Sequence, residues 1–170
     1  SNILYEIDGK PALELYKSLL GPAARDLPAS GVLFPLQLRE NLNKAPVVRT
    51  ISAINEENQS LIFTGNIPEG SYVRLMKANV NRLINGAEEA AKIANDVLKN
   101  EASLSIIVSC VGRRLVLKQL VEEEVEAVSD VLGDKTAITG FYSYGEIAPF
   151  REFSPCQLHN QTMTITSFSE

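Results

Sequence analysis

The chain has 170 residues, of which 45% are hydrophobic, and its 16 Lys and Arg against 21 Asp and Glu give a formal net charge of −5. This length and apolar content suffice for a core of ordinary size without disulfides. The acidic balance excludes a surface built to neutralise many phosphates, so no nucleic-acid partner is expected. No stretch approaches the roughly 20 apolar residues of a membrane-spanning helix, so no membrane association is expected either.

The first half of the chain is predicted to be rich in strands. Residues 3–8 alternate as a half-buried strand, and Pro11 then introduces a helix that Gly21 ends. Short strand-like segments separated by turn signals follow at 32–38, 47–54, 60–63 and 72–76. We expect residues 1–78 to form a β-hairpin or meander portion.

Helical and strand periodicities alternate in the second half, residues 79–170. Apolar residues recur at helical spacing from Asn79 to about Lys99, and again over 117–132 up to Gly133, while the run Glu122–Glu124 is expected on a solvated helix face. Strands are expected at 104–111, 137–142 and 162–168. The strand–helix–strand–helix–strand order indicates parallel pairing through right-handed crossovers.

These patterns predict an α/β fold class with a mixed β-sheet flanked by helices. The parallel strands are expected at 72–76, 104–111 and 137–142, and the early hairpins and the last strand are expected to be antiparallel. The whole chain, 1–170, is expected to be one domain with a strand-rich part at 1–78 and an α/β part at 79–170.

Polar side chains cluster where the expected parallel strands end. Ligands of open α/β sheets bind in the crevice outside this edge, and an antiparallel last strand would bring its amino end there too. The residues expected to bind a ligand are Gly112, Arg113, Tyr142, Ser143, Tyr144, Gly145, Glu146, His159 and Asn160.

The chemistry of these residues suits a small zwitterion such as an amino acid. Arg113 beside the free N–H groups of a helix start would receive a carboxylate. Glu146 would meet an ammonium group, and the rings of Tyr142 and Tyr144 offer packing or cation contact. We therefore expect a small-molecule binding module and not an enzyme, with no cofactor.

Two other functions stay open. Cys110 and His159 would serve as nucleophile and base in a cysteine-dependent hydrolase or transferase, although the apolar run around Cys110 favours a buried, reduced thiol and a cytoplasmic location. A protein-interaction adaptor without a metabolite ligand is the other alternative.

His159 is equally compatible with a structural hydrogen bond to Glu146. Cys156 with His159 supplies only half of a metal site, so no metal is expected.

Four stretches resemble the C-terminal part of the FIST (F-box and intracellular signal transduction) family: YEIDGKPAL at 5–13, CVGRR at 110–114, GFYSYGEI at 140–147 and LHNQTMT at 158–164. The resemblance implies a bacterial-type sensory input domain that binds small ligands such as amino acids and has no catalytic activity. The partners it implies are an upstream FIST N-terminal domain and signalling outputs such as histidine kinases, cyclic-dinucleotide enzymes or chemotaxis receptors.

Overall fold

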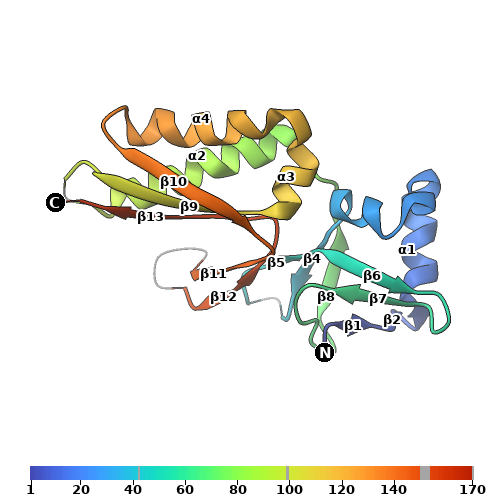
Figure 1. The fold of residues 1–170 in the computed structure, drawn as a ribbon. Helices are drawn as coiled ribbons and strands as arrows, with labels where there is room; N and C mark the ends of the chain where they lie inside the picture. The colour runs from blue at the N-terminus through green and yellow to red at the C-terminus, as the bar shows by residue number, and fades with distance from the viewer. Residues whose placement is uncertain (42, 99, 150–153, 170) are drawn as a thin grey trace. The chain divides into compact units, whose positions relative to one another are not determined.

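The computed structural model describes residues 1–41, 43–98, 100–149 and 154–169. It divides into two compact units, Ser1–Ala78 and Asn79–Glu170 (Figure 1). Helices and several β-sheets occur together, which confirms the predicted α/β fold class. Among the described residues, no helix has the length and apolar character needed to cross a membrane.

The first unit combines small antiparallel sheets with one helix. Its sheets have the strand orders β1-β7-β6, β5-β4-β8 and β2-β3. Leu13 and Tyr16 of α1 pack with Leu61 and Phe63 of β7 in a buried core. The elements are β1 (Ile3–Leu4), β2 (Glu6–Ile7), β3 (Lys10–Pro11), α1 (Ala12–Leu20), the 3₁₀ helices η1 (Gly21–Asp26) and η2 (Ala29–Leu33), β4 (Leu36–Arg39), β5 (Val47–Arg49), β6 (Ile51–Asn55), β7 (Ser60–Phe63) and β8 (Tyr72–Leu75).

Two predicted strands of the first unit differ from the structure. The strand expected at 32–38 is a 3₁₀ helix up to Leu33, and only β4 (Leu36–Arg39) is a strand. The strand expected at 47–54 is divided at Thr50, because the chain there leaves the sheet of β4 and enters the sheet of β7. Apolar periodicity continues across such a change of sheet and therefore does not reveal it.

The strand predicted at 72–76 belongs to the first unit and is not parallel to the others. β8 pairs antiparallel with β4. Its exposed Tyr72 and Arg74 alternate with half-buried Val73 and Leu75, as in an antiparallel sheet with one solvated face. The expectation that 72–76 shares a sheet edge with 104–111 and 137–142 is therefore wrong.

The second unit contains the predicted mixed sheet, in the order β10-β9-β13. β10 is parallel to β9 and β13 is antiparallel to it, and both orientations were predicted. Helices α2 and α4 lie side by side over one face of this sheet (Figure 1). The elements are α2 (Val80–Asp96), β9 (Leu104–Cys110), α3 (Val111–Leu117), η3 (Lys118–Leu120), α4 (Val121–Leu132), β10 (Ala137–Ser143), β11 (Glu146–Pro149), β12 (Cys156–His159) and β13 (Met163–Phe168).

The helices of this unit depart from prediction at their ends. Asn79 caps α2 by accepting a hydrogen bond from the Arg82 backbone N–H at 3.0 Å, while the expected end at Lys99 lies outside the described residues. The helix expected over 117–132 is interrupted at Lys118, which has a φ of +55°. The chain thus turns between α3 and α4, and α4 ends before Gly133 as predicted.

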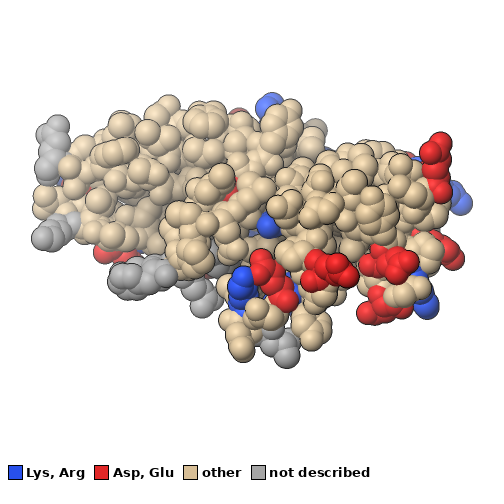
Figure 2. Space-filling model, turned by 90° about the horizontal axis from the view of Figure 1, so that it is seen from below, with Lys and Arg blue, Asp and Glu red and all other residues tan. Residues whose placement is uncertain are grey.

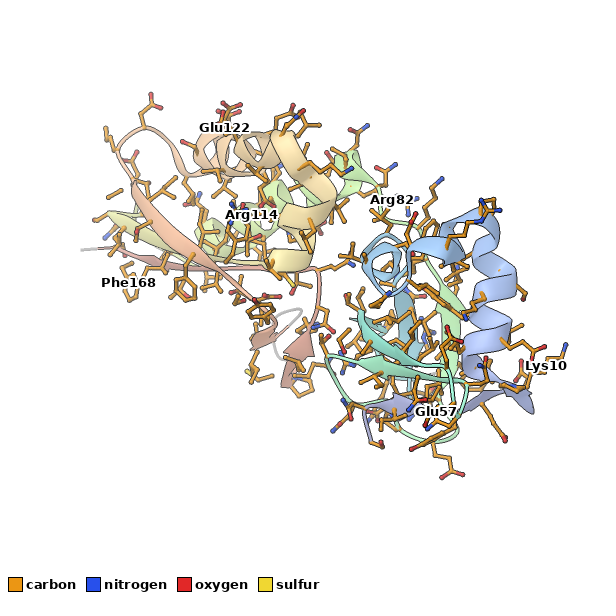
Figure 3. All side chains as sticks on the ribbon, turned by 45° about the vertical axis from the view of Figure 1, so that its right-hand side comes forward. Lys10, Glu57, Arg82, Arg114, Glu122 and Phe168 are labelled. Carbon is orange, nitrogen blue, oxygen red and sulfur yellow. The ribbon has the colours of Figure 1, made fainter. Side chains whose placement is uncertain are left out.

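One face of the sheet turns away from α2 and α4. Residue alternation gives this face Leu104, Ile106 and Val108 of β9, with Phe141 of β10 and Phe168 of β13 beside them. Phe141 is 63% exposed and Phe168 is 50% exposed. The view from below in Figure 2 shows mainly uncharged atoms over this unit, and Phe168 projects from this side in Figure 3. We call it the open sheet face.

Candidate functional site

All residues expected to bind a ligand lie in the second unit, but the sheet separates them into two groups. Tyr142 and Ser143 are neighbours at the end of β10, so their side chains point to opposite faces. The Tyr142 hydroxyl contacts Glu124 of α4, and the Ser143 hydroxyl contacts Glu146 of β11. One group therefore lies under the helices, and the other surrounds the start of the β11–β12 hairpin.

The group under the helices, here the Arg113 cluster, consists of Ser109, Arg113, Glu124 and Tyr142. Arg113 Nε donates to Glu124 Oε2 at 2.9 Å, and Arg113 Nη2 donates to the Leu83 carbonyl at 2.7 Å. Glu124 Oε1 also accepts from the Ser109 hydroxyl at 3.2 Å and the Tyr142 hydroxyl at 3.1 Å. Arg113 is 3% exposed and Glu124 is fully buried, so this is an ion pair of the interior. A ligand carboxylate at Arg113 would have to compete with Glu124.

The solvated helix face expected for the acidic run is correct for two of its members and wrong for the third. Glu122 and Glu123 are exposed, whereas Glu124 is buried. Because each residue turns a helix by 100°, Glu124 shares its stripe with buried Val128 and Leu132. The i, i+4, i+8 spacing was the signal in the sequence that could have identified Glu124 as the partner of Arg113.

Tyr142 links the Arg113 cluster to the protein surface. Partial burial raises the pKa of its hydroxyl, the negative charge of Glu124 raises it further, and Arg114 and Arg113 oppose the shift. The Arg114 guanidinium lies over the Tyr142 ring at 5.3 Å from the centroid. Tyr142 also borders an open hollow of about 370 Å³ lined with Val121, Glu122, Val125 and Glu126 of α4. This hollow was not among the predicted sites.

The second group, here the Glu146 cluster, consists of Ser143, Glu146 and Thr162. Glu146 Oε1 accepts from the Ser143 hydroxyl at 2.5 Å, and Oε2 accepts from the Thr162 hydroxyl at 2.7 Å. The side chain is 3% exposed. None of the ion pairs found among the described residues involves Glu146, so its described side-chain donors are neutral: two hydroxyl groups and the thiol of Cys110.

The β11–β12 hairpin brings His159 and Asn160 next to this cluster. Glu146 is directly opposite His159 in the hairpin. His159 Nε2 contacts the Ala148 carbonyl at 3.1 Å, and Asn160 Nδ2 donates to the His159 carbonyl at 3.2 Å. A Cβ on Gly145 would lie 2.9 Å from Leu158 Cδ1 and 3.3 Å from Asn160 Nδ2 and from the His159 carbonyl oxygen, so glycine lets the chain pass here without displacing these groups.

The hairpin was absent from the sequence-based prediction. Its inward residues Glu146 and His159 are polar, whereas Ile147 is 75% exposed, so the strand reverses the usual alternation. Tyr144, in the turn before it, is 83% exposed, and Gly112 is buried in α3. Ligand contact by any of these residues stays a prediction.

Cys110 ends β9 beside the Glu146 cluster, where it pairs in register with Ser143. It is buried, as predicted. Burial raises the pKa of the thiol, and the charge and hydrogen bond of Glu146 raise it further, while backbone bonds with Gln161 and Gly112 oppose the shift. The thiol therefore stays protonated at neutral pH, which disfavours Cys110 as a nucleophile.

Within the described part of the chain, no group of three or more His, Cys, Asp and Glu side chains is arranged to hold a metal.

The two cysteines should react with thiol reagents at very different rates. Cys156 is exposed, whereas Cys110 is buried and has a raised pKa, so we expect rapid modification of Cys156 alone at pH 8. Mass spectrometry after timed iodoacetamide treatment of the folded protein checks this, with the Cys156→Ser variant as control. Rapid labelling of Cys110 in that variant would contradict the buried, protonated thiol.

A family model for the FIST C domain matches residues 12–149. The chain belongs to this family. No curated protein and no solved structure matches the chain. The matched range contains the motifs at 110–114 and 140–147, which carried the resemblance, while 158–164 lies beyond it. Membership assigns this FIST C domain to the sensory domains of signal transduction.

Proposed function

We propose that this FIST C domain is a sensory input module whose Glu146 cluster binds the ammonium group of a small amine, with amino acids as the ligand class. The observation that carries the proposal is the buried Glu146 carboxylate, whose described side-chain donors are all neutral: the hydroxyls of Ser143 and Thr162 and the thiol of Cys110. A binding role, not a catalytic one, agrees with the protonated Cys110.

An ammonium group would complete the environment of Glu146. A carboxylate loses much hydration when it is buried, and neutral hydroxyl donors offset this loss less than a positive charge does. An ionised carboxylate offers about four acceptor sites, so Glu146 has room for one bond from an ammonium while it keeps those from Ser143, Thr162 and Cys110. Charge-assisted bonds inside a site of low dielectric would supply both affinity and selectivity for amines.

Entry of a ligand requires movement near Glu146, because that side chain is buried. The turn formed by Tyr144 and Gly145 joins β10 to β11, and Tyr144 is 83% exposed. We infer that this turn opens and closes over Glu146 and shifts the β11–β12 hairpin. A ligand that binds one arrangement more tightly would change their populations, which is the requirement for a signal.

The other predicted ligand residues have unequal support in this proposal. Tyr144, Gly145, His159 and Asn160 adjoin Glu146 along the hairpin and are proposed to line the same site. Gly112, Arg113 and Tyr142 belong to the helix-covered side, and their contact with a ligand would require the pair of Arg113 and Glu124 to open.

The proposed partners are an upstream FIST N-terminal domain and signalling outputs such as histidine kinases or cyclic-dinucleotide enzymes. The proposed location is the cytoplasm, where a reducing environment preserves thiols such as Cys110 and Cys156. Both proposals rest on the family and on thiol chemistry.

Thermal unfolding with a ligand panel tests the proposal. The panel contains the common amino acids, each paired with the same carboxylic acid lacking its amine. At 100 times its dissociation constant, a ligand stabilises the folded state by about 2.7 kcal/mol, which raises the Tm by several degrees. We expect such a shift for at least one amino acid and none for its desamino partner. Equal shifts within every pair, or no shift throughout, would contradict amine recognition.

A further inference from the structure

β10 is an edge strand without the usual features that prevent an edge from pairing with another strand. It lies at the end of the sheet order β10-β9-β13, and no described strand pairs with its outer side. Its sequence, AITGFYS, has no charged residue and no proline. Natural edge strands usually carry such residues or are covered, because a bare row of N–H and C=O groups recruits another strand. This seven-residue edge therefore has the properties of a pairing site.

The orientation of the backbone at the start of β10 leaves hydrogen-bonding groups on the free side. The Ala137 N–H donates to the Ser103 carbonyl, next to β9. Successive residues of a strand alternate in direction, so the N–H and C=O of Ile138 point away from β9. These groups are available to an added strand.

The two sides of this edge differ in chemistry. On the helix side, the hollow beside Tyr142 has apolar walls from Val121 and Val125 and acidic groups from Glu122 and Glu126. On the other side, exposed Thr139 and Phe141 border the open sheet face. An added strand would therefore meet acids on one side and an apolar surface on the other.

The spacing of the acids fits a strand. Glu122 and Glu126 are one helical turn apart, about 6 Å, and alternate side chains of a strand are about 6.7 Å apart. Lys or Arg at alternate positions would lay their apolar stems along Val121 and Val125 and reach the two carboxylates with their charged ends. Arg114 over the Tyr142 ring offsets part of this negative charge at one end of the hollow. Glu122 is labelled on α4 in Figure 3.

We propose that the free edge of β10 binds an extended basic segment of a partner protein as a fourth strand. In this segment Lys or Arg alternates with apolar or β-branched residues, which continue the open sheet face. Strand addition of this kind takes affinity from main-chain hydrogen bonds and specificity from alternate side chains. A second copy of this chain is disfavoured at the same edge, because pairing β10 with itself would bring two sets of Glu122 and Glu126 together.

Fluorescence anisotropy with labelled eight-residue peptides tests the proposal. One peptide alternates Lys with Val, the second has the same residues in two blocks, and the third alternates Glu with Val. We expect the alternating Lys peptide to bind at least about tenfold more tightly than the other two, equivalent to about 1.4 kcal/mol. Hydrogen exchange should show protection over 137–143 on binding and none over 163–168.

Charge reversal on α4 tests whether Glu122 and Glu126 select the basic peptide. In the Glu122→Lys/Glu126→Lys protein, preference should pass to the alternating Glu peptide. The Glu89→Lys/Asp96→Lys protein has the same net charge change on exposed sites of α2 and should keep the original preference. The proposal would be overturned if the block peptide bound as tightly as the alternating Lys peptide, or if both variants lost their preference for the alternating Lys peptide. Protection of β13 from hydrogen exchange on binding would overturn it too. A dimer of the free chain with 137–143 protected would overturn it as well.

Discussion

Replacing Glu124 with alanine should lower the free energy of unfolding by about 3–5 kcal/mol. The variant leaves the Arg113 guanidinium buried without its counter-charge, and it removes the acceptor of the Ser109 and Tyr142 hydroxyls. Arg113→Ala should cost a similar amount, because Glu124 then stays buried without a cation. Each loss is a large part of the 5–15 kcal/mol that separates folded from unfolded domains.

The double variant Arg113→Met/Glu124→Leu separates the contribution of the ion pair from the cost of leaving one charge buried alone. Removing both charges leaves no uncompensated ion, so we expect the double variant to be more stable than either single alanine variant. Chemical denaturation measures all three. The matched control is Glu101→Ala, since Glu101 and Lys135 form an exposed pair that should contribute about 1 kcal/mol or less. If the double variant lost as much stability as the two single alanine variants together, a coupled buried pair would be contradicted.

Gly140→Ala should destabilise the second unit by about 3 kcal/mol or more, at the upper end of overpacking costs. A Cβ on Gly140 would lie 2.0 Å from the Ile107 carbonyl oxygen and 2.8 Å from its carbon, both in the backbone of β9. Neither group is the end of a flexible side chain, so the central strand pair would have to separate.

Gly86→Ala is the control for this substitution. Gly86 is exposed on α2, and a Cβ added there would lie 3.9 Å from its nearest neighbour, Arg113 Nη1, which is an ordinary van der Waals contact. Alanine there should raise stability by up to about 1 kcal/mol through its higher helix propensity. Thermal or chemical denaturation should therefore show opposite signs for the two Gly→Ala variants. A neutral Gly140→Ala would contradict the close approach of β10 to β9.

The sequence predicted the elements that depend on apolar periodicity. Residues 60–63 and 104–110 form strands close to the predicted bounds, and the predicted orientations of β10 and β13 relative to β9 are correct. Helix α2 follows its alanine and leucine stripe and begins directly after its capping residue Asn79. The bounds of these helices and strands depend on local patterns, so one sequence suffices to find them.

Features that depend on polar contacts between distant segments could not be predicted in this way. Glu124 resembles its exposed neighbours until its partner Arg113 is known, and the β11–β12 hairpin has polar residues on its inner side. Of the predicted ligand residues, Ser143 and Glu146 make contact, but alternation along β10 separates them from Tyr142 and Arg113, and ligand binding by any of them stays a prediction. A single residue of register decides which face each side chain joins.

Calorimetric titration of the folded protein and its Glu146→Gln variant with the amino acid that gives the largest thermal shift tests the proposed amine site most directly. Glutamine keeps the shape of the side chain and removes the negative charge that an ammonium would meet. We predict that the variant binds at least tenfold more weakly, equivalent to about 1.4 kcal/mol, and that the exposed control Glu69→Gln binds like the original protein. Unchanged affinity in a folded Glu146→Gln variant would contradict the account.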